Sequence, residues 1–223
     1  MAVNTEKYKE IVAELNEKKV TLVAVSKTKP NEDIQSLYDL GQRDFGENYV
    51  QELVDKQAAL PKDIRWHFIG HLQSNKVKYI APFVHLIHGV DSLKLLKEIN
   101  KQAAKCNRVI DCLLQVHIAQ EETKFGMDEA ELKEANLQIS ELATVRVMGL
   151  MGMASFSDDL NKVRNEFHSL HILFTKIRES SGVKRELSTL SMGMSGDYQM
   201  GIEEGSTMVR IGSLLFGTRN KPL

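Results

Sequence analysis

Val20-Thr-Leu-Val-Ala-Val-Ser26-Lys27-Thr28-Lys29-Pro30 is an apolar run of strand length that ends at a serine and a lysine. Pro30 can neither extend a strand nor sit inside a helix, so the run stops here. A nearly continuous apolar run of this kind predicts a parallel strand that is buried on both faces. Lys27 is then expected at the C-terminal tip of the strand, where open α/β sheets and α/β barrels place their chemistry.

The amine of Lys27 is the first candidate for chemistry. A lysine amine that is partly removed from water becomes nucleophilic, and it can attack an aldehyde or ketone to form a Schiff base. A single lysine at the end of a strand is more often an ordinary surface residue. The reactive interpretation therefore depends on what stands at the ends of the other strands.

Outward from this strand, the sequence alternates between strand and helix patterns. Further strands are predicted at 43–46, 64–69, 84–88, 109–117, 145–151, 186–190 and 207–211. Helices are predicted at 4–18, 31–40, 47–60, 75–80, 92–105, 128–142, 158–180 and 198–204, with Asp91 as the N-cap of the fifth. This order predicts an α/β fold, one (β/α)8 TIM barrel domain over residues 1–223 with an extra N-terminal helix. The doubly wound alternative needs a Gly-rich dinucleotide turn after an early strand, and residues 26–30 do not form one.

The composition limits the classes of partner. The 223 residues are 42% hydrophobic and 26% charged, with a formal net charge of −1, which disfavours a dedicated nucleic-acid or anionic-membrane binder. No apolar run reaches membrane-spanning length, and the charged N-terminus lacks the apolar core of a secretory signal. Cys106 and Cys112 match no zinc or redox spacing and are expected to be free thiols. We therefore expect a cytoplasmic protein that binds neither nucleic acid nor membrane.

The predicted tips of the last two strands are rich in small residues. A barrel commonly binds phosphate through the loops after strands seven and eight, where backbone N–H groups face the anion. Ser191, Gly193, Gly212 and Ser213 would let the backbone approach a phosphate and would add two hydroxyl donors. The sequence has no Walker-type Gly-x-x-x-x-Gly-Lys-Ser/Thr motif, so a nucleoside triphosphate site is not expected.

Arg210 falls inside the predicted eighth strand. A fixed cation in a barrel needs a partner, because an unpaired buried charge is very costly. One interpretation is a structural ion pair with Glu47, Glu203 or Asp197. The other is a donor to a ring nitrogen or to an acidic ligand, and the sequence leaves both open.

A lysine that can form an imine, a phosphate cradle and a strand-borne arginine together describe a pocket for pyridoxal 5′-phosphate (PLP). Seven segments, in order along nearly the whole chain, resemble the pyridoxal phosphate homeostasis protein family (YggS/PROSC), whose members are single barrels similar to the N-terminal domain of alanine racemase. They are VAVSKTKP (23–30), FGENYVQE (45–52), WHFIGHLQSNK (66–76), EETKFG (121–126), GLM (149–151), LSMGMSGDY (190–198) and GSTMVRIGSLLFG (205–217).

The resemblance implies a role for each site residue. Lys27 would hold PLP as an internal aldimine, and Arg210 would face the pyridine nitrogen. The remaining positions fall into two groups, phosphate binding by Ser191, Met192, Gly212 and Ser213, and pocket lining by Asn48, His67 and Met151. The implied function is to buffer or deliver PLP and to keep vitamin B6 and amino-acid pools balanced, with apo forms of PLP-dependent enzymes as partners and a monomer as the assembly.

The resemblance also implies a holder of PLP more than a catalyst. Arginine has only donors and stays protonated, so beside the ring nitrogen it keeps that nitrogen unprotonated and the ring a weak electron sink. Two-base racemisation would need a second acid/base group, which alanine racemase-like enzymes take from another domain of the partner subunit. This chain ends at Leu223 and is expected to lack such a domain.

Two enzymatic alternatives stay open. One is a PLP-dependent amino-acid racemase, and the other is a cofactor-free class I aldolase that uses Lys27 directly. Histidine pairs such as His67 and His71 have no third ligand at a fixed spacing, so no metal site is expected. The loop at residues 119–126 is a candidate lid or partner surface.

Overall fold

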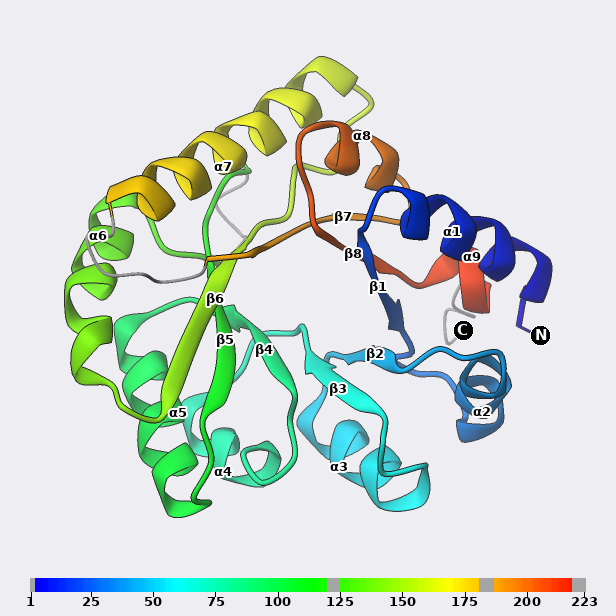
Figure 1. The fold of residues 1–223 in the computed structure, drawn as a ribbon, viewed down its shortest axis with the longest axis horizontal. Coiled ribbons are helices and arrows are strands. Elements are labelled where there is room, and N and C mark those ends of the chain that lie inside the picture. Colours follow the sequence, from blue (N-terminus) through cyan, green and yellow to red (C-terminus); the bar gives the residue numbers. More distant parts are fainter. Residues whose placement is uncertain (1–2, 120–124, 181–186, 218–223) are drawn as a thin grey trace, which may run out of the picture.

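The computed structural model of the chain describes residues 3–119, 125–180 and 187–217. Within these residues, eight parallel strands close into a barrel in sequence order, and β8 pairs with β1 (Figure 1). The predicted (β/α)8 barrel is confirmed. The strands are β1 (Thr21–Val25), β2 (Asp44–Glu47), β3 (Arg65–Phe68), β4 (Leu86–Val90), β5 (Ile110–Gln115), β6 (Val145–Met151), β7 (Thr189–Met194) and β8 (Met208–Ile211).

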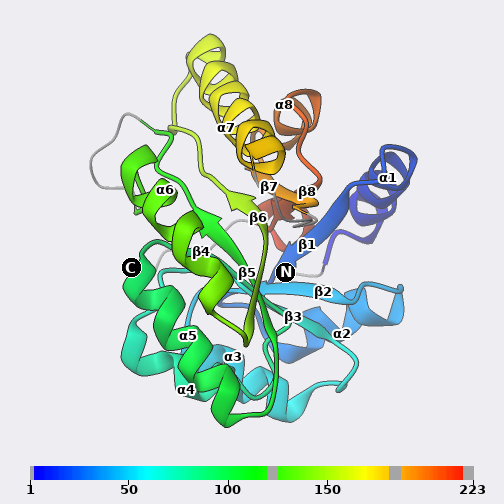
Figure 2. The same cartoon turned by 60° about the vertical axis from the view of Figure 1, so that its left-hand side comes forward.

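Helices surround the outside of the barrel, as Figures 1 and 2 show. The α-helices are α1 (Thr5–Glu17), α2 (Asn31–Asp39), α3 (Val50–Ala59), α4 (Val77–Ile80), α5 (Leu93–Lys105), α6 (Glu129–Gln138), α7 (Leu160–Ser180), α8 (Tyr198–Glu203) and α9 (Ser213–Phe216). Two short 3₁₀ turns are η1 (Ser74–Lys76) and η2 (Ile139–Glu141). None of the described helices is long and apolar enough to cross a bilayer.

The strands alternate their side chains between two apolar cores. On β1, Leu22 and Ala24 pack into the large core between the barrel and its helices. Val23 points the other way, into a smaller interior cluster that also holds Leu86, Leu113, Met151 and Met208. The same period of two continues past the end of β1, so it carries Val25 and Lys27 toward the barrel mouth.

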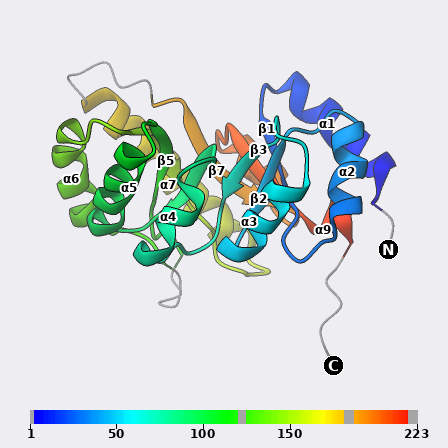
Figure 3. The same cartoon turned by 90° about the horizontal axis from the view of Figure 1, so that it is seen from below.

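The extra N-terminal helix is confirmed, and it is tied to the barrel at two places. Tyr8 on α1 donates from its hydroxyl to Gln42 Oε1 (3.3 Å), and the Gln42 amide donates to Leu22 O (2.9 Å). At the start of the helix, Asn4 N donates to Leu215 O in α9 (2.8 Å), so α1 and α9 lie side by side (Figure 1). Figure 3 shows α1 and α2 at one end of the molecule and α6 at the other.

Several boundaries differ from the sequence prediction, among them those of β4, β7 and α5. β4 begins at Leu86, two residues later than expected. β7 covers Thr189–Met194, so Ser191 lies inside the strand and not in a loop beyond it, because its neighbours Met151 and Met208 pair with it on both sides. The N-cap of α5 is Ser92, whose Oγ accepts from Leu95 N (3.3 Å). Asp91 is therefore not the cap, and its carboxylate contacts His71 instead.

Gly149 on β6 sits where a side chain would overlap β7. An added Cβ would collide with the carbonyl oxygen of its partner Thr189. We predict that Gly149→Ala lowers the free energy of unfolding by about 3 kcal/mol, because the paired strands must separate locally. Gly196→Ala is the matched control, since its added Cβ has open space around it, and its effect should stay within about 0.5 kcal/mol. Chemical denaturation measures both variants, and equal stabilities would contradict the prediction.

Candidate functional site

A pocket of about 490 Å³ opens at the C-terminal mouth of the barrel, where the tips of β1, β2, β3, β7 and β8 converge. Its volume is in the range of small-molecule and cofactor sites. The pocket is lined by Val25, Lys27, Lys29, Asn48, Ile69, Met153, Phe156, Met194, Ser195, Gly196, Asp197, Arg210, Gly212, Ser213 and Gly217.

A buried ion pair fixes the chain just before Lys27. Lys56 Nζ from α3 donates to Ser26 O (2.8 Å) and pairs with Glu47 (2.8 Å). Ser26 Oγ donates to the same carboxylate oxygen, Glu47 Oε1 (2.6 Å). The carbonyl and the hydroxyl of Ser26 are thus both fixed by hydrogen bonds, and the half-buried Lys27 comes directly after this fixed residue.

Lys29 has a different environment from Lys27. Its Nζ donates to Phe216 O (2.6 Å) and to Gly217 O (3.3 Å), which ties the loop after β1 to the end of α9. Lys29 therefore closes one wall of the pocket, and its amine is occupied by backbone carbonyls. Lys27 and Lys29 are two positions apart in the sequence and line the same pocket, but the amine of Lys29 is bound to the end of α9.

Arg210 is buried, with 4% of its surface exposed, and neutral oxygens hold it. Its Nη1 donates to Ser191 O (2.9 Å) and Ser191 Oγ (2.6 Å), and its Nη2 donates to Gly152 O (3.0 Å). Burial lowers the pKa of Arg210 to about 10, with the negative charge of Asp197 opposing the shift. The group keeps its charge at neutral pH.

The structural ion pairs considered for Arg210 are not formed with two of the three candidate carboxylates. Glu47, at the end of β2, forms its ion pair with Lys56 of α3. Glu203 pairs with Arg164 on the outside of the barrel. The third candidate, Asp197, lies in the lining of the same pocket, and its negative charge acts on Arg210. The buried positive charge of Arg210 faces this pocket, which suits a ligand with an anionic group or a lone pair.

Small residues line the wall beside Arg210. An added Cβ at Gly212 would lie 3.2 Å from Val25 O, so β8 approaches β1 closely at this position. The Gly212 N–H donates to Ser195 Oγ (3.1 Å), and the exposed Ser213 follows at the start of α9. Across the pocket, Asn48 Oδ1 is buried and, among the described residues, has no hydrogen-bond partner. An orphaned acceptor of this kind needs a ligand or a water molecule.

The sequence-predicted site residues fall into two groups. Lys27, Asn48, Arg210, Gly212 and Ser213 line the mouth pocket together. Four others do not line it, namely Ser191, Met192, His67 and Met151.

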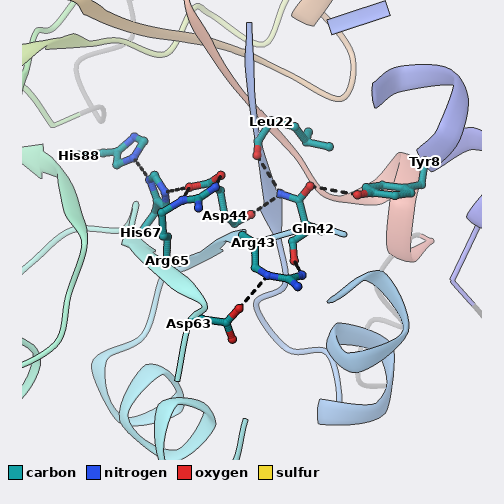
Figure 4. A network of polar contacts seen from close by, with 9 residues as sticks. All are labelled: Tyr8, Leu22, Gln42, Arg43, Asp44, Asp63, Arg65, His67 and His88. Carbon is teal, nitrogen blue, oxygen red and sulfur yellow. Dashed lines mark hydrogen bonds and ion pairs between the residues drawn. The ribbon is translucent and has the colours of Figure 1, made fainter. Parts of the chain in front are cut away.

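Each of these four has a distinct place. Ser191 lies directly beneath Arg210 and accepts its hydrogen bond. Met192 points outward into the core between barrel and helices, and Met151 belongs to the interior apolar cluster. His67 faces the interior too, but deeper, where its ring contacts His88 and Asp44 (Figure 4). Strand alternation explains which way each side chain points, and the register explains its depth.

The pocket is also lined by Ile69, Met153 and Phe156, which the sequence pattern did not predict. Phe156 is fully exposed at the rim. Ile69 could have been found from period-two alternation through His67 on β3. Phe156 comes after the end of β6 and carries no such pattern.

The predicted lid at residues 119–126 lies mostly outside the described residues. Its described end, Phe125, stacks on the ring of His71 with centroids 4.1 Å apart. Gln115 Nε2 at the end of β5 donates to Phe125 O (2.8 Å). This end of the loop is therefore anchored to the barrel rim.

One group of metal-ligating side chains occurs within the described residues, at the opposite end of the barrel. Ligand atoms of Asp44, His67 and His85 lie within 4.8 Å of one another. The guanidinium of Arg65 already contacts both oxygens of Asp44. A metal ion there would have to displace this cation. The two cysteines, Cys106 and Cys112, are both free.

Comparisons with known proteins agree with this geometry. The family model described as "Alanine racemase, N-terminal domain" matches residues 3–220. A pyridoxal phosphate homeostasis protein of Aquifex aeolicus (strain VF5) is 45% identical over 199 residues, which cover 89% of this chain and 86% of that protein. The chain belongs to the pyridoxal phosphate homeostasis protein family. A member of this family from Synechocystis sp. is 40% identical and covers 95% of this chain and 97% of its own length.

Solved structures extend the comparison to three dimensions. PipY of Synechococcus elongatus, solved without PLP, superimposes with a TM-score of 0.90 at 35% identity and covers 95% of this chain and 99% of PipY. The same protein with PLP bound gives a TM-score of 0.84 at 36% identity, with 93% and 99% covered. Alanine racemase from Streptomyces coelicolor is 18% identical with a TM-score of 0.75, and this likeness concerns the fold alone.

Asp44 lies at the floor of the barrel, the end opposite the mouth, and its ionisation makes the stability of the fold depend on pH. Burial by itself raises the pKa of Asp44, but hydrogen bonds from Arg65 and His67 outweigh burial and hold the pKa well below its usual range. In the unfolded chain the carboxyl titrates near pH ~4. The ionised group therefore stabilises the fold above that pH, and this stabilisation is lost as the pH falls.

We predict that the difference in unfolding free energy between the wild type and Asp44→Asn shrinks by about 1 kcal/mol when the pH is lowered from about 6 to about 3. Urea denaturation at a series of pH values measures this difference. A difference that stays constant, or that grows toward low pH, would contradict the assignment of Asp44.

Proposed function

We propose that this protein binds PLP in the mouth pocket, holds it covalently through Lys27 and acts in PLP (vitamin B6) homeostasis. The observation that carries the proposal is the combination of two groups in one pocket, the amine of Lys27 and the buried guanidinium of Arg210, which donates to the neutral oxygens of Ser191 and Gly152. Together they match a ligand with an aldehyde and an acceptor ring nitrogen. PipY, at 36% identity, has been solved with PLP bound.

The residues present fit the cofactor. The guanidinium of Arg210 offers a donor to the pyridine nitrogen, and Gly212 with Ser213 offers a close backbone approach and a hydroxyl to the phosphate. Asn48 brings a buried amide whose oxygen has no partner among the described residues. Ser191, Met192, Met151 and His67 act from behind this lining, through Arg210 or through packing. When bound, the cofactor supplies an aldehyde and a conjugated ring that withdraws electrons.

The positive charge of Arg210 directs the site toward storage and delivery of PLP. A guanidinium has no proton acceptor and stays charged, so it favours an unprotonated ring nitrogen, and the ring then withdraws electrons weakly. The protein is proposed to buffer PLP or to deliver it to apo forms of PLP-dependent enzymes, without robust catalysis of its own. We propose it as one cofactor-binding domain over residues 1–223, a monomer, working in the cytoplasm, where its two free thiols suit a reducing environment.

The absorbance of the PLP-loaded protein tests the covalent role of Lys27. We predict a visible absorption band that borohydride removes without any added substrate, and we predict that Lys27→Ala loses this band. Lys29→Ala is the matched control, because Lys29 is bound to the carbonyls of α9, and it should keep the band. Colour that persists in Lys27→Ala, with its adduct mapped to another lysine, would contradict the assignment.

The same preparations discriminate the two enzymatic alternatives. A racemase would exchange the α-proton of amino acids with solvent deuterium, which NMR detects directly. A class I aldolase would be colourless and would be trapped by borohydride only with its carbonyl substrate present. The proposed function predicts neither result.

A further inference from the structure

A continuous line of polar side chains crosses the barrel interior from Arg210 toward the floor. We call it the interior polar chain, and its members are Arg210, Ser191, His88, His67 and Asp44. Ser191 Oγ lies 3.2 Å from His88 Nδ1, and His88 Nε2 lies 2.9 Å from His67 Nδ1. His67 Nε2 lies 2.9 Å from Asp44 Oδ1 (Figure 4). Each of these residues is buried, and each link is of hydrogen-bond length.

The two ends of the interior polar chain have fixed roles. The guanidinium of Arg210 can only donate, and it donates to Ser191 Oγ at 2.6 Å. The carboxylate of Asp44 can only accept, and its other hydrogen bonds come from Arg65. Each member between these ends can both donate and accept: a neutral imidazole donates at one nitrogen and accepts at the other, and the Ser191 hydroxyl does both at its oxygen.

We propose that His67 and His88 are positioning residues that carry one hydrogen-bond direction from Arg210 to Asp44 and so hold the guanidinium in place for the cofactor. In this direction His67 donates from Nε2 to Asp44, and His88 donates from Nε2 to His67 Nδ1. Ser191 then donates its hydroxyl proton to His88 Nδ1, which leaves its lone pairs for Arg210. Every donor and acceptor in the line is satisfied with both imidazoles neutral.

The opposite direction fails at Ser191. It would need an additional proton on His67, with His67 donating from Nδ1 to His88 and His88 donating from Nδ1 to Ser191 Oγ. Ser191 Oγ would then accept from both His88 and Arg210, and its own proton would have no acceptor among its described hydrogen-bond partners.

The direction matters for the cofactor, and in this respect the inference depends on the proposed function. If Ser191 loses its acceptor at His88, its hydroxyl proton can turn toward the N–H groups of Arg210. Two donors would then face each other beneath the pocket, and the guanidinium would shift from the position at which it meets the ring nitrogen. His88 therefore acts through Ser191 and Arg210, although it does not line the pocket.

Nitrogen NMR on the cofactor-free wild type reads the direction itself. With ¹⁵N-labelled histidine at neutral pH, a long-range ¹H–¹⁵N correlation should show His67 and His88 each protonated at Nε2 and unprotonated at Nδ1. A His88 ring protonated at Nδ1 would overturn the inference. This readout does not need PLP, so it stands even if the protein proves not to bind the cofactor, an outcome that would refute only the proposed function.

Two substitutions at His88 then test the positioning role. His88→Leu removes both contacts, and we expect it to weaken PLP binding roughly tenfold, the cost of losing a hydrogen bond within a charged network. His88→Asn keeps an acceptor near the position of Nδ1 for the Ser191 hydroxyl, and its affinity should stay within about threefold of the wild type.

Titration with PLP, followed by absorbance, gives both affinities. Strong weakening in His88→Leu with recovery in His88→Asn supports the inference. Wild-type affinity in both variants, or equal losses in both, would overturn it, because the first removes any link to the pocket and the second indicates a packing role alone. If a variant does not fold, the tautomers of the wild type still decide the question.

Discussion

The buried charge of Arg210, which lines the mouth pocket and donates to neutral oxygens of Ser191 and Gly152, sets the requirements for the rest of the site. Removing a guanidinium from water is costly unless its N–H groups find acceptors. The barrel supplies Ser191 and the carbonyl of Gly152, and burial lowers the pKa of Arg210 to about 10 without discharging it. A charge stabilised in this way is a preformed recognition element for a ligand with an acceptor nitrogen.

The polar groups behind the pocket are arranged in two separate networks, one under each reactive position. Under Lys27, the buried pair of Lys56 and Glu47 fixes Ser26 at the end of β1. Under Arg210, the line through His88 and His67 leads to the ionised Asp44 at the barrel floor. Both networks stand on parallel strands with packed apolar faces, so the lysine and the arginine are held by rigid elements.

Much of the fold follows from pattern alone. The apolar run in β1, the repeated alternation and the stop at Pro30 predict the barrel and place Lys27 at its mouth, because strand and helix periodicities are local properties. The eighth strand and Arg210 follow by the same rule. For β7, the sequence alternates small and apolar residues on both sides of Ser191, so only pairing with β6 and β8 defines its end.

The depth of a side chain in the barrel is harder to predict than its direction. Alternation along β3 sends both His67 and Ile69 inward, but only the three-dimensional structure shows that the mouth pocket reaches down to Ile69 and stops above His67. The partners of His67 come from β2 and β4, and no spacing in the sequence joins Asp44 and His88 to it. These contacts join residues that are far apart in the sequence, and for this reason the interior polar chain is visible only in three dimensions.

The central claim is that Arg210 meets the ring nitrogen of bound PLP as a permanent donor. The most direct measurement is the ¹⁵N NMR shift of the pyridine nitrogen in the protein loaded with ¹⁵N-labelled PLP, recorded at neutral pH. We expect an unprotonated, hydrogen-bonded nitrogen in the wild type, and we expect its shift to change in Arg210→Met. A protonated pyridine nitrogen in the wild type would show that Arg210 does not donate to it.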